Sequence, residues 1–227
     1  MLLKRFPCMI AALAILAAAP IVCAADKDEE AVRLERARVA FQEMRDGKDE
    51  KIPQKLMERA RCIAVIPGVV KVALGVGGRH VKGVMSCRDT SGRWGPPVFL
   101  QMTGGSFGFQ VGVEKADVVL FFMTDRSAQA VLDSKFTLGA KAGLAAGPVG
   151  RTAEAETDIK LDAEIYSYAR SKGLFAGVSL EGAKIAPDKS DNRDFYGKTA
   201  DPRTILIEHR TPVAIAPEAQ AWMNALP

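Results

Sequence analysis

Several residue types and motifs on which enzymes depend are scarce or missing in this chain of 227 residues. Histidine occurs only at His80 and His209, which are too far apart in sequence to form a zinc signature. There is no GK[ST] phosphate loop, and Gly75–Gly78 has neither the glycine spacing nor the following helix of a dinucleotide fingerprint. The sequence therefore predicts no cofactor and no metal site.

Excess positive charge is also lacking. The chain has 31 basic and 27 acidic residues, and the first 25 residues contain Lys4 and Arg5 but no acid. Removing that segment lowers the net charge from +4 to +2. Nucleic-acid-binding domains concentrate basic residues on one face and have a high isoelectric point. The composition argues against a nucleic-acid partner.

An apolar run long enough to span a membrane is absent beyond the N-terminal segment. Residues 1–25 combine a basic start with the apolar stretch Met9–Ala19 and a small-residue cleavage pattern at Val22–Ala24. These features are typical of a signal peptide, because the apolar stretch is too short for a comfortable span. We expect cleavage after Ala24 or Ala25, export to the periplasm, and one domain over residues 26–227.

A lipid anchor at Cys23, with membrane association through it, is disfavoured. Lipoprotein signals place leucine three positions before the modified cysteine, and this chain has Pro20 there. Cleavage without lipidation leaves only Cys62 and Cys87, and an even number of cysteines in an exported chain predicts a disulfide. The alternative for this pair is two buried thiols.

Apolar residues alternate with glycine through much of the stretch Cys62–Val113. Alternation with period two predicts strands, and short glycine-containing connections predict antiparallel neighbours. Leu34, Ala37, Phe41 and Met44 form one apolar stripe and predict an amphipathic helix over Asp28–Arg45. The sequence predicts an α+β fold: an antiparallel, glycine-rich sheet or barrel-like core, covered by N-terminal amphipathic helices and closed by a C-terminal helix from Pro217.

Three local expectations concern the connections. Pro67-Gly68 is interpreted as a turn that ends the strand beginning at Cys62. The polar segment Pro187–Tyr196 is interpreted as a surface loop, and its acids lack the glycine and terminal glutamate of an EF-hand. Thr204–Ile207 fits either a strand or a short helix.

The order of motifs resembles the SYLF family over most of residues 26–227. The matching segments are Ala64–Pro67, Val76–Gly78, Lys82–Val84, Leu100–Ser106, Gln110–Gly112, Asp117–Leu120, Ser134–Gly139, Ala145–Arg151, Gly173–Gly182 and Tyr196-Gly197. The resemblance implies a domain that binds acidic phospholipids, partly through an N-terminal amphipathic helix, and no catalytic residues. Some relatives bind actin, but this chain has no SH3 or FYVE segment and has an export signal. Phospholipid is therefore the expected partner and actin an improbable one.

Basic residues near an apolar patch are the expected contacts for an anionic headgroup, at about 1 kcal/mol each. The candidates are Arg33 and Arg36 on the first helix, with Lys71, Arg79 and Lys82 around the glycine-rich strands. The resulting hypothesis is an exported, non-catalytic envelope protein that binds phospholipid.

Two alternatives from other classes remain. One is a scaffolding envelope protein whose partner, not identified by the sequence, is another protein. The other is a serine hydrolase, because Gly104–Gly108 fits G-x-S-x-G around Ser106, with Asp158 or Asp162 and then His209 downstream. A nucleophile elbow requires a helix after the serine, whereas a strand is predicted there, so a hairpin turn is favoured.

Overall fold

The computed structural model describes residues 25–47, 52–70, 81–103, 115–132, 136–139, 143–147, 163–171, 174–175, 180 and 182–227. Its helices are α1 (Ala25–Arg45), α2 (Gln54–Arg59), α3 (Asp125–Ala130), α5 (Lys189–Tyr196), α6 (Pro202–Ile207) and α7 (Pro217–Ala225). Its strands are β1 (Cys62–Val70), β2 (Val81–Cys87), β3 (Val98–Thr103), β4 (Lys115–Phe122), β5 (Leu144–Ala146), β6 (Ile165–Ser171), β7 (Leu174–Phe175) and β8 (Lys184–Pro187).

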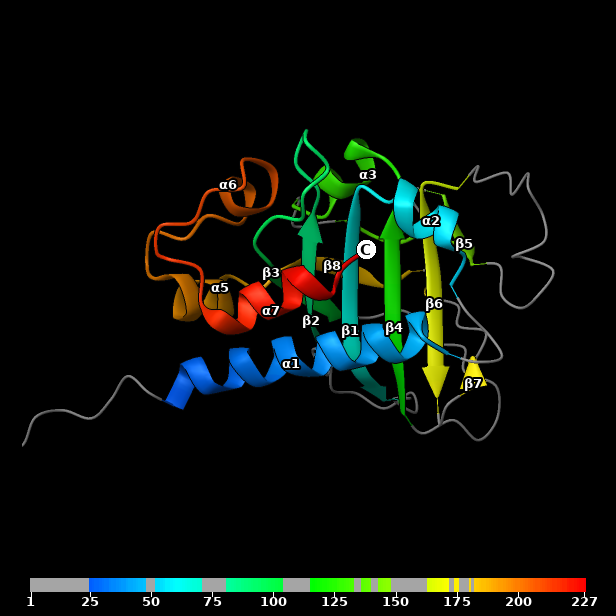
Figure 1. The fold of residues 1–227 in the computed structure, drawn as a ribbon, viewed down its shortest axis with the longest axis horizontal. Helices are drawn as coiled ribbons and strands as arrows, with labels where there is room; N and C mark the ends of the chain where they lie inside the picture. Colours follow the sequence, from blue (N-terminus) through cyan, green and yellow to red (C-terminus); the bar gives the residue numbers. More distant parts are fainter. Residues whose placement is uncertain are drawn as a thin grey trace, which may run out of the picture.

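One curled sheet forms the centre of the molecule, in the order β5-β6-β4-β1-β2-β3-β8, and β7 also pairs with β6. Every pair is antiparallel except β5 with β6. Short connections favour antiparallel neighbours, and the curl follows from the twist of adjacent strands. The predicted α+β class with a mainly antiparallel sheet is confirmed. Helices α1 and α7 lie side by side across one face of this sheet, and α5 lies near the first half of α1 (Figure 1).

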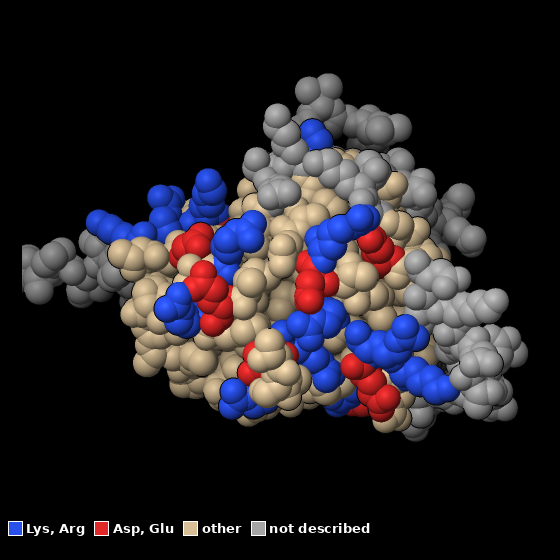
Figure 2. Space-filling view, turned by 90° about the horizontal axis from the view of Figure 1, so that it is seen from above, with Lys and Arg blue, Asp and Glu red and all other residues tan. Residues whose placement is uncertain are grey.

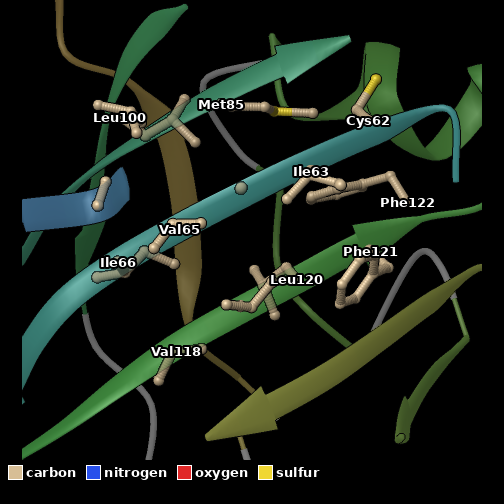
Figure 3. Close-up of a cluster of buried hydrophobic side chains, with 14 of the residues drawn as sticks. Cys62, Ile63, Val65, Ile66, Met85, Leu100, Val118, Leu120, Phe121 and Phe122 are labelled. Atoms are coloured by element: carbon tan, nitrogen blue, oxygen red, sulfur yellow. The ribbon is translucent and has the colours of Figure 1, made fainter. Parts of the chain in front are cut away.

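The core is built around the central strand β1. Residues Ile63 to Ile66 are completely buried, so both faces of this strand are covered. Side chains from β1, β2, β3 and β4 fill the space beside it (Figure 3). The strand is consequently almost continuously apolar, which is the pattern of a strand buried on both faces.

The backbone of β1 continues through Pro67-Gly68. Its pairing with β4 shifts register between Ile66 and Val69, which makes this dipeptide a β-bulge. Gly68 has φ of +68°, and its amide donates to the Asp117 carboxylate at 2.7 Å. The prediction of a strand-ending turn is wrong, because the glycine supplies the irregular backbone inside the strand and Asp117 satisfies the donor that the bulge leaves unpaired.

Glycine has a clear packing reason at one place in the described sheet. A Cβ atom at Gly83 on β2 would lie 2.6 Å from the carbonyl oxygen of Val65 on β1. Glycine therefore permits the close approach of these two backbones. The glycine-rich segments at 71–80 and 104–114 lie outside the described residues.

Cys62 and Cys87 face each other in the register of β1 and β2 and form a disulfide with a Cα–Cα distance of 4.0 Å. Reducing it is expected to lower the free energy of unfolding by about 3 kcal/mol, because the bridge constrains the unfolded chain. Urea denaturation with and without reductant measures this difference. Reductant should have no effect on a Cys62→Ala/Cys87→Ala variant. Equal midpoints for the oxidised and reduced protein would contradict the expectation.

Within the described residues, no helix has both the length and the apolar character needed to cross a membrane.

Candidate functional site

Helix α1 has one buried face and one exposed face. The predicted stripe of Leu34, Ala37, Phe41 and Met44 is completely buried, which confirms the helix and its inward-facing side. The opposite face exposes Val32 by 48% and Val39 by 39%, and these residues are two turns apart. From residue 29 onward, where the side chains of α1 are described, the other exposed residues of this face are Glu29, Glu35, Arg36 and Glu43. Glu35 is paired with Arg38 and Glu43 with Arg170, so the narrow apolar ridge is flanked by largely balanced charges.

Helix α5 supplies acidic residues of an ionic cluster that also includes residues of α1 and β2. Asp188 caps it: the side chain accepts hydrogen bonds from the amides of Ser190 and Asp191, and the helix ends before Gly197. The prediction of a loop over Pro187–Tyr196 is wrong. The aspartate cap and the terminal glycine were both readable in the sequence, but the high polarity of this short segment obscured them.

The position of α5 against β3 is fixed by Asn192. The Phe99 amide donates to Asn192 Oδ1 at 3.1 Å, and Asn192 Nδ2 donates to the Phe99 carbonyl at 2.8 Å. At the end of the helix, the Tyr196 hydroxyl donates to the Pro97 carbonyl at 2.6 Å. Because Asn192 is completely buried, these bonds hold α5 in one orientation.

An ionic cluster joins α1, β2 and α5. Arg33 on α1 donates to Asp191, and both side chains are buried, with 10% and 5% of their surfaces exposed. Lys82 on β2 donates to the other carboxylate oxygen of Asp191 at 2.8 Å and lies 3.7 Å from Asp188. The Arg33 guanidinium also lies 5.6 Å from the centre of the Phe99 ring, a favourable cation–π contact. Buried charges of this kind need complete pairing.

The pKa values in the cluster follow from burial and pairing. Burial lowers the pKa of Lys82, but the hydrogen bond to Asp191 and the attraction of that carboxylate outweigh it, so the pKa is raised. Burial acts to raise the pKa of Asp188, but hydrogen bonds from Ser190 and from the Asp191 amide lower it overall. Both groups are thus held in their charged forms.

Glu30 is the exception in this region. Its side chain is buried on the same side of α1 as Arg33, and Oε2 has no hydrogen-bond partner among the described residues. Burial raises its pKa and repulsion from Asp191 and Asp194 adds to the shift, while a hydrogen bond from its own backbone amide and the attraction of Arg33 oppose it without cancelling it. Glu30 is therefore the carboxylate of the cluster that keeps one buried oxygen without a hydrogen bond from the described residues.

The structure brings two of the predicted lipid contacts together and separates a third. Arg33 and Lys82 meet at Asp191, whereas Arg36 is exposed on the outer face of α1. Lys71 and Arg79 lie outside the described residues. Sequence reasoning missed Glu30, Asp188, Asp191 and Asn192 as members of one site, because their grouping depends on packing between distant segments.

The residues of the hydrolase hypothesis are only partly described. Ser106, Asp158 and Asp162 lie outside the described residues. His209 has φ of +54°, and its Nδ1 atom is buried without a hydrogen-bond partner. A Cβ atom at Gly95 would lie 2.0 Å from this nitrogen, so glycine makes room for the ring. Burial lowers the pKa of His209, which favours the neutral imidazole.

The described surface has a mixed charge pattern. Seen from above the view of Figure 1, basic and acidic side chains are interspersed over the described part of that face (Figure 2). Many are paired, for example Arg61 with Asp125 and Arg126 with Glu164, both at 2.8 Å. Within the described residues, no group of three or more histidines, cysteines or acids could hold a metal ion.

Comparison with known proteins identifies the family. The profile of the Ysc84 family, described as Las17-binding protein actin regulator, matches residues 103–227, more than half of the chain. The chain belongs to this family. The membership confirms the resemblance to SYLF proteins.

Three relatives show how far the similarity extends. The SH3 domain-containing YSC84-like protein 1 of Xenopus laevis is 36% identical over 155 residues, which are 68% of this chain and 46% of the relative. The human protein of the same name is 35% identical over 153 residues, 67% of this chain and 44% of the relative. LAS seventeen-binding protein 3 of Saccharomyces cerevisiae is 35% identical over 175 residues, 75% of this chain and 38% of the relative. The chain spans less than half the length of these relatives.

The predicted partners need correction. The family description and the yeast relative's name refer to a protein that binds Las17, and the description adds actin regulation. These names point to protein and actin-related partners, so the expectation of phospholipid with actin improbable is wrong. The expectation against actin was drawn in part from the N-terminal export pattern, and that pattern does not determine what the surface of the Ysc84 domain binds.

Proposed function

We propose that this chain is a non-catalytic protein-binding module of the Ysc84 family. The observation that carries the proposal is the family match over residues 103–227, because the family description specifies binding to a protein. Of the alternatives drawn from the sequence, the one with a protein partner is the one that this match supports.

The exposed face of α1 is the contact surface that we propose. Val32 and Val39 form an apolar ridge, and Arg36 lies on the same face between them. The buried centre of a protein interface is more apolar than its rim, and arginine is enriched at interfaces. The ridge is presented on a rigid support, because the opposite face of α1 is buried against the sheet and α7.

The charges around this ridge favour a protein over an anionic membrane. Glu29, Glu35 and Glu43 are exposed on the same face as Arg36. Arg38 is half-buried and donates to Glu35 at 2.6 Å. Glu43 is likewise paired with Arg170 at 3.2 Å, so Glu29 and Arg36 remain as one exposed charge of each sign on the described part of this face. A face without excess positive charge does not attract an anionic membrane, whereas a protein can complement both the apolar ridge and these two charges.

Co-sedimentation with filamentous actin is the first test, since actin regulation is the activity in the family description. We expect the purified protein to pellet with filaments, and Val32→Ser/Val39→Ser to weaken binding by about tenfold or more, the equivalent of at least 1.4 kcal/mol. The matched control is Val213→Ser, which changes an exposed valine outside α1. A parallel co-sedimentation with vesicles of anionic phospholipid tests the alternative that the protein binds a membrane. Pelleting with vesicles but not with filaments would overturn the proposal. Unchanged filament binding by the double variant would show that the exposed face of α1 is not the contact surface.

Export through residues 1–25 is a separate proposal, supported by the charge and apolar pattern of that segment. N-terminal sequencing after cell fractionation tests it, with Ala25 or Asp26 as the expected first residue in the periplasmic fraction. An intact Met1 in the cytoplasmic fraction would overturn it. The result decides in which compartment the partner is sought.

A further inference from the structure

The ionic cluster of Glu30, Arg33, Lys82, Asp188 and Asp191 contains an unequal number of opposite charges. Three carboxylates share the site with two cations when every group is ionised. The residual negative charge is costly because the carboxylates are buried. Uptake of one proton would bring the net charge of the cluster to zero.

The hydrogen bonds identify which carboxylate takes the proton. Asp191 accepts from Arg33 and Lys82, so its charge is stabilised from two sides. Asp188 accepts from the Ser190 hydroxyl at 2.6 Å and from two backbone amides at the start of α5. Glu30 Oε2 is buried and has no partner among the described residues. Glu30 is therefore the group that gains most from being neutral.

Glu30 also lies where its charge affects the contact between the N-terminal half of α1 and α5. It lies in the first turns of α1, one helical turn before Arg33, and Arg33 links this part of the helix to α5. Helix α5 is itself fixed to β3 by Asn192. A charge that appears on Glu30 faces Asp191 and Asp194 on α5, with Arg33 and Lys82 as the nearby cations. Repulsion from α5 then acts on the segment of α1 that carries Val32.

We propose that Glu30 is a proton-operated latch, which holds the N-terminal half of α1 against α5 when protonated and loosens it when ionised. The direction follows from linkage. The pKa of Glu30 is raised in the folded protein, so protonated Glu30 stabilises the folded state. This contribution to the free energy of unfolding is complete below the ordinary glutamate pKa range and is lost as the pH rises through the folded-state pKa. The latch goes beyond the proposed partner binding and does not depend on it.

Hydrogen exchange measured by mass spectrometry from pH 4 to 8 tests the latch, with exchange corrected for its intrinsic pH dependence. We expect the protection factor of peptides within residues 25–34 to fall as the pH rises, by about tenfold for each unit by which the folded pKa exceeds the unfolded one. Glu30→Gln should keep protection high and nearly independent of pH. Glu29→Gln, an exposed neighbour, should behave like the unmodified protein.

Two outcomes would overturn the latch: protection of residues 25–34 that does not change with pH in the unmodified protein, or the same fall in Glu30→Gln. A carboxyl-carbon NMR titration of the unmodified protein provides a test that needs no folded variant. The Glu30 carboxyl should titrate above the ordinary glutamate range, and titration within that range would contradict the proposal. Asp188 does not interfere in this window because its pKa is lowered.

Discussion

Replacing Asp191 with alanine is expected to lower the free energy of unfolding by about 3–5 kcal/mol, the usual cost of removing one partner of a buried ion pair. The change leaves the Arg33 guanidinium buried without the carboxylate to which it donates. Lys82 is affected less, because 37% of its side chain is exposed and Asp188 remains 3.7 Å away. Chemical denaturation monitored by tryptophan fluorescence measures the loss.

Two control variants distinguish the stability lost with the ion pair from a general destabilisation of α5. Asp194→Ala on the same helix removes an exposed carboxylate and should change stability by no more than about 0.5 kcal/mol. The double variant Arg33→Met/Asp191→Ala should lose clearly less than the sum of the single losses, because it leaves no unpaired guanidinium. Additive losses would show that Arg33 and Asp191 are not energetically coupled.

Replacing Trp222 with alanine is expected to cost about 3–5 kcal/mol, because the change leaves a large cavity between α7, α1 and the sheet. The indole is completely buried, and its ring centre lies 6.5 Å from that of Phe41 in an edge-to-face contact. Its Nε1 donates to the Ser86 hydroxyl on β2 at 2.9 Å. One side chain therefore ties the C-terminal helix to α1 beside it and to the sheet beneath it.

The same denaturation measurement applies, with two matched variants. Trp222→Phe retains an aromatic ring near Phe41 but loses the bond to Ser86, so its loss should lie between those of the unmodified protein and Trp222→Ala. Gln220→Ala, an exposed change on α7, should be nearly neutral. A loss below about 1 kcal/mol for Trp222→Ala would mean that α7 contributes little to the core.

The helices that sequence periodicity could predict are those with long, regular apolar stripes. In α1 the stripe fixed both the helix and its buried face, and Pro217 marked the start of the C-terminal helix. Helix α5 has only eight residues, and just two of its members, Phe195 and Tyr196, are aromatic or aliphatic. A helix of about two turns is too short for its periodicity to be distinguished from that of a polar loop, so its caps are what could have identified it.

The strands show a similar division. Strand β2 lies within the stretch Cys62–Val113, where alternation and flanking turn residues predicted strands from local sequence alone. In β1, however, Pro67-Gly68 has the composition of a turn, and only pairing with β4 and the bond from Gly68 to Asp117 turn it into a bulge. Local chemistry cannot distinguish these outcomes, since both accommodate a glycine with positive φ.

The sequence by itself determined the α+β class, the amphipathic first helix and the resemblance to the SYLF family, because each depends on local periodicity or on the order of motifs. Only the tertiary structure decided which residues the candidate residues contact. Arg33 and Lys82 were predicted to contact a headgroup, and the packed chain brings both to Asp191, which is 158 and 109 positions away from them. Contacts over such separations depend on strand register and on helix packing, and neither leaves a local signal in the sequence.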